Sequence, residues 1–358
     1  MRVTFLPKSP GNPYQRGLEN ALSEYGVEIV RLRQRVLSLP FGLLRRRPDI
    51  IHLHWLHYFT TGRWTATALS RYCLFRIGWA LFRLFRRRIV WTVHNFRDHE
   101  GRNARLERWC TSHVSRRADA IIVHCGYARR QLLERFPHVS PETVHVIPHG
   151  NYCEAYENKT PRSDARKRIG LQPGQFVFLF LGQIRSYKGV MELIDAFGTV
   201  RDRAARLLIA GRAPEAGTEQ KISERVKKDE RLDYRPGFVP EAEVQWYMNA
   251  CDVLVCPYRD VLTSGSVVLA SSFARPCVAP RLGCIPEQVE ERDSFLYDPD
   301  RPGALAEALG RALASRDRLT EMGERSRERA SQWSWRRVAQ LTLAVYRACQ
   351  GPQTARRP

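Results

Sequence analysis

The sequence has no long apolar run, since no stretch of its 358 residues reaches the ~18 apolar residues that a membrane-spanning helix needs. Residues 1–7 are typical of a first β-strand and lack the long apolar region of a signal peptide. Internal repeats are absent, and only the short tail from residue 351 onward has low complexity. We therefore expect a cytoplasmic protein of about two domains.

Pairs of the form C-x-x-C are also absent, although the sequence contains nine cysteines. Because this number is odd, disulfides within the chain cannot pair all of them, and the missing spacing argues against a zinc site. Reduced thiols, as in a cytoplasm, are the expected state.

Acidic residues are scarce relative to basic ones: 37 Asp and Glu stand against 58 Lys and Arg, which gives a net charge of +21. Such a charge makes nucleic acid, anionic membrane surfaces and anionic small molecules candidate partners. The basic residues crowd into residues 31–47 and residues 63–88, the second segment being bounded by Arg63 and Arg88. No recognised nucleic-acid module accompanies them, so nucleic acid is not an expected partner.

Residues 63–88 have the pattern of a basic amphipathic helix. Arg76, Arg83 and Arg87 fall on one face of a helical wheel, and Trp79 lies at its border. The opposite face is apolar and consists of Leu74, Phe75, Leu81, Phe82 and Phe85. This pattern favours a helix lying on an anionic membrane surface. The alternative is an ordinary surface helix whose apolar face packs in the core.

Apolar runs alternate with helical patterns in both halves of the chain. Strands are predicted over residues 2–6, 27–32, 50–55, 89–95, 120–124 and 144–150, and then over residues 176–181, 206–210, 232–235, 252–257 and 277–280. Two successive sets of strands and helices predict two Rossmann-like lobes.

Four predicted strands of the first half end in histidine, namely in His54, His94, His124 and His149. Ligands of open parallel sheets lie beyond the carboxyl ends of the strands, so these histidines are placed to contact one ligand. Around His94 the polar residues Asn95, Asp98, His99 and Glu100 add a possible base and hydrogen-bond donors for a hydroxylated acceptor.

A metal site at His52, His54 and His57 is not expected. The spacing His-x-His in a strand puts both rings on one face, but no carboxylate or cysteine accompanies them.

Residues 176–189 combine an apolar strand, a glycine, a cationic loop and a helix start. The strand stops at Gly182, Arg185 and Lys188 follow, and helical spacing begins at Val190. A helix N-terminus with a guanidinium and an ammonium favours a dianion, most naturally a diphosphate. A second small polar loop, which contains Thr263, precedes another apolar helix and predicts a further anion site.

Six short motifs follow one another in the order and spacing of a known family. They are residues 147–150 (I-P-H-G), 182–189 (G-Q-I-R-S-Y-K-G), 237–239 (G-F-V), 250–257 (A-C-D-V-L-V-C-P), 283–287 (G-C-I-P-E) and 334–335 (S-W). The chain resembles the group 1 glycosyltransferase family of the GT-B fold over essentially its whole length. This resemblance implies an α/β fold of two Rossmann-like lobes that face a central cleft. It further implies an N-terminal acceptor domain, residues 1–160, to which a C-terminal helix, residues 336–350, returns, and a nucleotide-sugar-binding domain, residues 161–335.

The resemblance also implies roles for individual residues. Lys188 takes the diphosphate, and because Gln183 stands where the family often has arginine, the second cation is Arg185. His94 matches a first-lobe histidine near the transferred sugar, so His94, Arg185 and Lys188 are the expected catalytic residues. The expected donor-binding residues are Gly182, Gln183, Phe238, Val239, Asp260, Thr263, Ser264, Gly265, Ser266 and Glu287, and the acceptor-side residues are Asn12, His54, Asn95, His99 and His149. Neither a metal nor a cofactor is expected, because the cations themselves supply the charge.

One departure from the family concerns the pair Glu-x7-Glu that its retaining members usually carry. Residues 259–270 contain neither glutamate; Asp260 lies near the first position and Leu269 or Ala270 near the second. Whether the reaction retains or inverts configuration, and which sugar is used, is therefore left open.

The expected function is transfer of a sugar from a nucleotide-diphosphate donor to a glycan or lipid-linked acceptor, for exopolysaccharide or cell-envelope glycan synthesis. The basic helix would hold the enzyme peripherally on the inner face of the plasma membrane. The alternatives are a nucleotide-sugar epimerase of the same fold and a non-catalytic basic protein that binds sugar nucleotide or nucleic acid.

Overall fold

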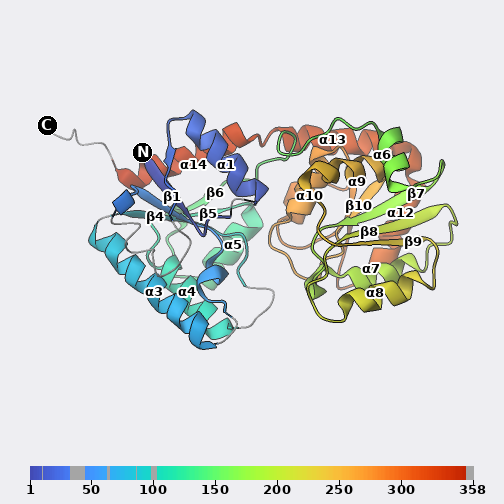
Figure 1. Ribbon diagram of the computed structural model, residues 1–358. Helices are drawn as coiled ribbons and strands as arrows, with labels where there is room; N and C mark the ends of the chain where they lie inside the picture. The colour runs from blue at the N-terminus through green and yellow to red at the C-terminus, as the bar shows by residue number, and fades with distance from the viewer. Residues whose placement is uncertain (10, 33–44, 63–64, 86, 98–102, 352–358) are drawn as a thin grey trace. The chain divides into compact units, whose positions relative to one another are not determined.

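The computed structural model describes the chain except for residues 10, 33–44, 63–64, 86, 98–102 and 352–358 (Figure 1). The chain folds into two compact units. The first unit consists of residues 1–150 and 334–358, and the second consists of residues 151–333. Within the described residues, no helix has both the length and the apolar character to cross a membrane.

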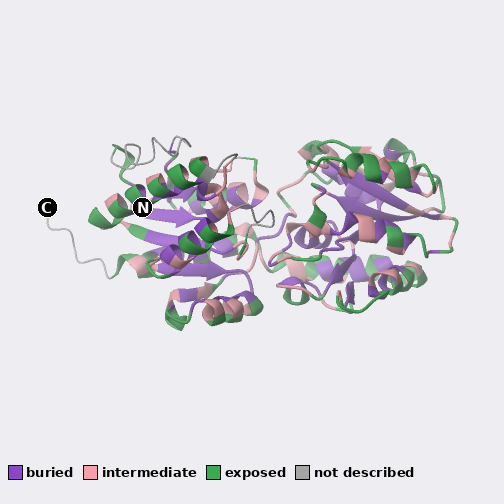
Figure 2. Ribbon diagram, turned by 90° about the horizontal axis from the view of Figure 1, so that it is seen from below, coloured by how far each residue is buried: buried purple, intermediate pink, exposed green. Residues whose placement is uncertain are grey.

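The first unit is built on a parallel sheet of six strands in the order β2-β1-β3-β4-β5-β6. The strands are β1 (Arg2–Leu6), β2 (Glu28–Ile29), β3 (Ile50–Leu53), β4 (Arg88–Thr92), β5 (Ala120–Val123) and β6 (Val144–Val146). All residues of β3 and β5 are buried, as expected for parallel strands covered on both faces. Figure 2 shows these buried strands among helices whose outer sides are exposed.

The helices of the first unit are α1 (Pro13–Glu24), η2 (Leu56–Phe59), α3 (Thr65–Leu84), α4 (Ala104–Ser115), α5 (Gly126–Arg135), η3 (Pro141–Thr143) and α14 (Trp335–Gln350). Helix α14 returns from the end of the chain and packs on α1. Gly17 makes this close packing possible, because a Cβ atom there would lie 2.4 Å from the Trp335 ring. Val338 and Tyr346 of α14 are buried in the same core as Leu18.

Helix α3 packs part of its predicted apolar face in the core, as the alternative of an ordinary surface helix implies. Trp79, predicted at the border of the basic face, is 3% exposed, and Phe75 is fully buried and stacks on Phe59 with ring centroids 4.5 Å apart. The helix therefore packs an apolar stripe in the core of the unit. Arg87 lies beyond the end of the helix, 3.6 Å from Asp49.

The boundary between the units falls at Gly150, earlier than the predicted residue 160. The segment that follows Gly150 is held by the second unit: the Tyr152 N–H donates to Ser272 Oγ at 2.8 Å. Farther along, the backbone N–H groups of Lys159 and Thr160 both donate to Gln245 Oε1, at 2.9 and 3.0 Å. Hydrogen bonds to residues distant in sequence decide this boundary.

The second unit contains a parallel sheet of six strands in the order β12-β11-β10-β7-β8-β9. The strands are β7 (Phe176–Leu181), β8 (Ala205–Gly211), β9 (Leu232–Pro236), β10 (Val253–Val255), β11 (Cys277–Pro280) and β12 (Phe295–Tyr297). The helices are α6 (Arg162–Ile169), η4 (Ser186–Lys188), α7 (Val190–Phe197), α8 (Thr218–Val226), η5 (Glu241–Glu243), α9 (Val244–Ala250), α10 (Gly265–Ser272), α11 (Ile285–Gln288), α12 (Ala304–Ala314), η6 (Arg316–Arg318) and α13 (Leu319–Ser331). The predicted α/β class with two Rossmann-like lobes is confirmed.

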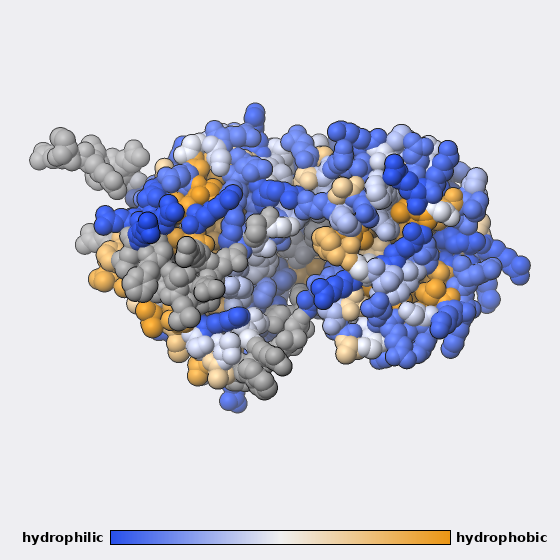
Figure 3. Space-filling view, in the orientation of Figure 1, coloured by the Kyte–Doolittle hydropathy of each residue, from blue (hydrophilic) through white to orange (hydrophobic). Residues whose placement is uncertain are grey.

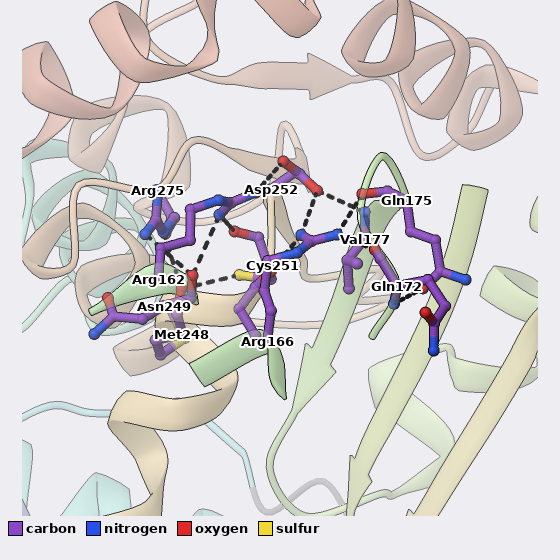
Figure 4. A network of polar contacts seen from close by, with 11 residues as sticks. Arg162, Arg166, Gln172, Gln175, Val177, Met248, Asn249, Cys251, Asp252 and Arg275 are labelled. Atoms are coloured by element: carbon purple, nitrogen blue, oxygen red, sulfur yellow. Dashed lines mark hydrogen bonds and ion pairs between the residues drawn. The ribbon is translucent and has the colours of Figure 1, made fainter. Parts of the chain in front are cut away.

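A polar network around Asp252 ties α6 to the starts of β7 and β10 (Figure 4). The Asp252 carboxylate accepts the Val177 N–H at 2.7 Å and the Arg162 guanidinium at 2.6 Å. Arg162 also donates to the Cys251 carbonyl at 2.7 Å, and Arg166 donates to the Ala250 carbonyl at 3.0 Å. Asp252 thus has a structural role, remote from the carboxyl ends of the strands.

Replacing Asp252 with alanine is expected to lower the free energy of unfolding by about 2 kcal/mol, because the Val177 N–H and Arg162 lose their shared acceptor. Chemical denaturation of the purified protein measures this change. The exposed Asp317 is the matched control, and its alanine variant should change stability by less than about 0.5 kcal/mol. Equal unfolding midpoints for the two variants would contradict the structural role.

Candidate active site

The loop between β7 and α7 brings two cations to the carboxyl edge of the second sheet. Gly182 ends the strand with φ 128°, a value that favours glycine, and its N–H donates to the Ala210 carbonyl at 2.9 Å. Gly189 starts α7 with φ 67°, and a Cβ atom there would lie 2.0 Å from the Pro257 carbonyl oxygen. Gly189 thus allows the loop to lie directly against Pro257, which follows β10.

Lys188 is half-buried in this loop, and its Nζ lies 3.6 Å from the position of a Cβ atom at Gly182. The ammonium also lies over the Tyr258 ring, 6.0 Å from its centroid. Burial, together with the neighbouring charge of Arg185, lowers the pKa of Lys188, while Cys256 acts in the opposite direction. The Arg185 Nε donates to Gln183 Oε1 at 3.1 Å. The predicted residues of this loop are therefore close together.

The second predicted anion site lies where β10 leads into α10. Ser264 is 2% exposed and caps α10, since its Oγ accepts the Val267 N–H at 3.2 Å. The same hydroxyl donates to the Tyr258 OH at 3.2 Å, so Ser264 supports the loop and is not presented to a ligand. Its neighbours Thr263, Gly265 and Ser266 are partly exposed. Tyr258, which directly follows the motif of residues 250–257 and was not predicted as a site residue, contacts both predicted anion-binding loops, through Lys188 and Ser264.

The remaining predicted donor residues lie on neighbouring loops of the same sheet edge. Phe238 follows β9 and is 80% exposed, Asp260 is exposed after β10, and Glu287 is exposed on α11 after β11. Val239 is half-buried beside Phe238. Parallel strands place all of these loops at one edge, because their carboxyl ends point the same way.

The strand-end histidines of the first unit surround one buried phenol, that of Tyr14 on α1. The Tyr14 ring lies 5.9 Å from the ring of His54, 4.8 Å from His94, 5.4 Å from His124 and 4.9 Å from His149, measured between centroids. The topology thus brings together imidazoles from four strand ends. Tyr14 was missed from the sequence; the proline and the capping residue just before it mark only the helix start.

His94 is held by two neighbours from β3's carboxyl end. His54 Nδ1 lies 3.1 Å from His94 Nε2, and the Trp55 ring stacks on His94 with centroids 4.6 Å apart and an interplanar angle of 18°. The predicted Asn95 is half-buried beside it. Asn12, by contrast, caps α1, since its Oδ1 accepts the Tyr14 N–H at 2.9 Å. His99 lies outside the described residues.

The imidazoles of this cluster are neutral near neutral pH. Burial and the neighbouring histidines hold the pKa values of His54 and His94 well below the usual range. Burial lowers the pKa of His124 to about 4 and, together with repulsion from His124, lowers that of His149 to about 3. A neutral imidazole keeps a lone pair with which it can accept a proton. In the described part of the chain, no group of three or more His, Cys, Asp or Glu side chains is arranged to hold a metal ion.

Comparisons with known proteins find matches to both units of the chain. The family described as "Glycosyl transferases group 1" matches residues 175–315, and "Glycosyltransferase Family 4" matches residues 28–151. The chain is 26% identical to the GDP-mannose:glycolipid 4-beta-D-mannosyltransferase of Xanthomonas campestris pv. campestris, with 96% of this chain and 92% of the relative covered. It is 25% identical to the D-inositol 3-phosphate glycosyltransferase of Corynebacterium glutamicum, with 83% and 72% covered.

Solved structures share the fold. Sucrose-phosphate synthase of Thermosynechococcus elongatus superposes with a TM-score of 0.77 at 17% identity, covering 97% of this chain and 98% of that structure. Anabaena Alr3699/HepE in complex with UDP and glucose superposes with a TM-score of 0.73 at 17% identity, covering 96% and 98%. The two family matches together span most of the chain, and both units have the expected sheets. The chain therefore belongs to the group 1 glycosyltransferases of the GT-B fold, and it is a glycosyltransferase.

Proposed function

We propose that the enzyme moves a sugar from a nucleotide-diphosphate donor, bound by the second unit, to a lipid-linked or glycan acceptor at the cytoplasmic membrane surface. The observation that carries this proposal is the pair of cations, Lys188 and Arg185, in the glycine-bounded loop after β7. The N-terminus of α10, with Thr263 and Ser266 partly exposed, lies on the neighbouring strand's loop.

In this reaction the bond between the sugar C1 and the donor's phosphate oxygen breaks, and the electron pair leaves with the diphosphate. A new bond forms between C1 and the acceptor oxygen, whose proton is taken by a base. Fixed cations stabilise the charge that grows on the leaving diphosphate, and they do so more in the transition state than before it. Lys188 and Arg185 supply that charge, so we propose that no metal ion is required.

We propose His94 as the base that takes the acceptor proton. Its pKa is lowered, so the ring is unprotonated at neutral pH, and His54 and Trp55 hold its orientation. The absence of both glutamates in residues 259–270 adds weight to a base outside the donor loop.

Replacing His94 with alanine is expected to reduce the transfer rate by more than tenfold and to change donor affinity by less than twofold, because the donor loops lie in the second unit. Steady-state kinetics and calorimetric titration with the nucleotide diphosphate separate the two effects. The exposed His138 of the same unit is the matched control, and its alanine variant should transfer at the normal rate. Parallel losses of transfer and donor binding in the His94 variant would indicate a structural role instead.

Two observations support a lipid-linked acceptor. The Xanthomonas relative is named for transfer to a glycolipid, and the net charge of this chain is +21. The name of this relative also gives GDP-mannose as its donor, so guanosine diphosphate is the first nucleotide to test. No epimerase occurs among the relatives described above.

The donor proposal is tested by a thermal-shift screen of the protein against UDP, GDP, ADP and CMP and their common sugars. A ligand at 100 times its Kd should add about 2.7 kcal/mol to stability. A shift with one nucleotide diphosphate identifies the base. If none of them shifts the melting temperature, the donor site is wrong.

A further inference from the structure

A small pocket lies beyond the carboxyl ends of β3 and β4 in the first unit. Its volume is about 10 Å³, and His94 and Asn95 line it together with Arg97, Glu107 and Thr111. That volume suits about one water molecule, so one hydroxyl group of a ligand fits inside, but a phosphate does not. A phosphate on the same ligand must therefore lie outside, at the rim of the pocket.

Three arginines from three segments of the chain lie around this pocket. Arg97 follows β4 and lines the pocket, and Arg108 follows the pocket residue Glu107 on α4. Arg135, the last residue of α5, has its guanidinium carbon 5.9 Å from the centroid of the Phe96 ring, and Phe96 directly precedes Arg97. Arg97 and Arg108 are exposed and Arg135 is half-buried, so an anion in the solvent can reach all three.

The positive charges of these arginines act on one another. Burial lowers the pKa of Arg135, and the charges of Arg97 and Arg108 lower it further, whereas Glu107 acts in the opposite direction. Among the described residues, no hydrogen bond or ion pair engages the guanidinium group of any of the three arginines. Glu107 can balance only one positive charge, so an anion that binds here lowers the free energy of the remaining cations.

The donor groups of this cluster favour a phosphate. Each guanidinium presents several N–H donors in a planar fork that matches phosphate oxygens. A carboxylate has too few oxygens for three such groups, whereas a phosphate or diphosphate has enough. In the proposed function the donor diphosphate contacts Lys188 and Arg185 of the second unit, while this cluster shares the pocket of His94. The anion that the cluster matches is therefore on the acceptor.

Exposed apolar side chains lie near the cluster. Trp109, which follows Arg108 on α4, is 60% exposed. Helix α4 packs against α3, on which Ile77 is 53% exposed and Leu84 is 73% exposed. Figure 3 shows hydrophobic side chains gathered on the surface over α3. A lipid chain joined to the phosphate would find apolar surface here, which a soluble sugar phosphate does not need.

We propose that Arg97, Arg108 and Arg135 bind a phosphate or diphosphate group of the acceptor while the reacting hydroxyl enters the pocket beside His94. That the ligand is the acceptor rests on the proposed function. That its anionic group is a phosphate rests on the three arginines alone. The acceptor class is then a sugar joined to a phosphate, with a lipid carrier on that phosphate as the expected form.

Calorimetric titration of the full-length protein with three synthetic probes tests the proposal. Glucosyl farnesyl diphosphate carries sugar, diphosphate and lipid; farnesyl glucoside lacks the diphosphate; and glucosyl methyl diphosphate lacks the lipid. We expect the first probe to bind at least about tenfold tighter than farnesyl glucoside at the same ionic strength. Arg97→Gln and Arg135→Gln should each reduce this preference below about threefold. Arg130→Gln, an equal loss of charge at an exposed position of α5, should leave it unchanged.

Equal binding of glucosyl farnesyl diphosphate and farnesyl glucoside would overturn the proposal, as would an unchanged preference in both cluster variants with normal melting temperatures. Loss of the preference in Lys188→Ala would place the diphosphate in the donor site and would also overturn it. Glucosyl methyl diphosphate distinguishes the two sources of the phosphate: weaker binding than the farnesyl compound assigns a lipid carrier, and equal binding assigns a soluble acceptor. The nucleotide thermal shift is measured on the same variants and should be normal, so failure of the donor site is distinguished from failure of this site.

Discussion

Replacing Lys188 with alanine is expected to lower the rate of sugar transfer by more than tenfold, which corresponds to a barrier higher by about 1.4 kcal/mol or more. The ammonium lies between the turn at Gly182 and the ring of Tyr258, where a donor diphosphate would meet it at the end of β7. Because the site is partly buried, its charge is screened less than a surface charge. Arg185 lies in the same loop, where its Nε donates to Gln183 Oε1 at 3.1 Å.

Single-turnover transfer and nucleotide-diphosphate affinity, both measured on the purified variant, check this result. The exposed Lys221 of α8 is a matched control in the same unit, and its alanine variant should retain full activity. Lys188→Arg should recover part of the rate, because it restores the charge with a different shape. Wild-type transfer by the alanine variant would remove Lys188 from the mechanism.

Acidification is expected to unfold the first unit well before the second. The second unit contains no histidine, so all ten lie in residues 1–150. Burial lowers the pKa of His52 to about 3, with a further contribution from His124, whose own pKa is lowered to about 4. His52 is fully buried, with Nδ1 2.6 Å from the Tyr346 OH and Nε2 2.6 Å from Thr92 Oγ1.

The direction of the effect follows from proton binding. These histidines have lower pKa values in the folded state than the ordinary 6.5, so the unfolded chain binds protons first as the pH falls. Their contribution to stability is complete above pH 6.5 and is lost progressively toward pH 4. One such histidine costs about 1.6 kcal/mol between pH 6.5 and pH 5, so His52 and His124 together cost about 3 kcal/mol.

Hydrogen exchange of the backbone amides, read separately in the two units at pH 7.5, 6.5 and 5.5 after correction for the intrinsic rates, measures this loss. Protection in β3, β4 and β5 should decrease with pH, whereas protection in β7 and β8 should change far less. His138→Gln removes an exposed histidine and should reduce the dependence far less than His52→Gln does. An equal response of both units would show that groups other than the buried histidines control acid stability.

Local sequence patterns predicted eleven of the twelve strands in the described residues, missing β12, and they predicted the strand, loop and helix start around residues 182–189. The apolar run before Gly182 formed β7, fully buried, and the helical spacing after Gly189 formed α7. Parallel strands must leave their loops at one edge, so the predicted donor residues could be placed together without coordinates. Such patterns succeed because they depend on neighbours within one strand or one turn.

Only the tertiary structure decided which polar side chains already have hydrogen-bond partners within the protein and which side chains contact one another. Ser264 was predicted to bind donor, but it is buried as the cap of α10; Trp79 was placed at a helix border, but it lies in the core. The histidines gather around Tyr14 because β3 to β6 and α1 converge there. Each of these outcomes depends on contacts between residues far apart in the sequence. The packing of whole helices and strands sets such contacts, and local periodicity does not encode them.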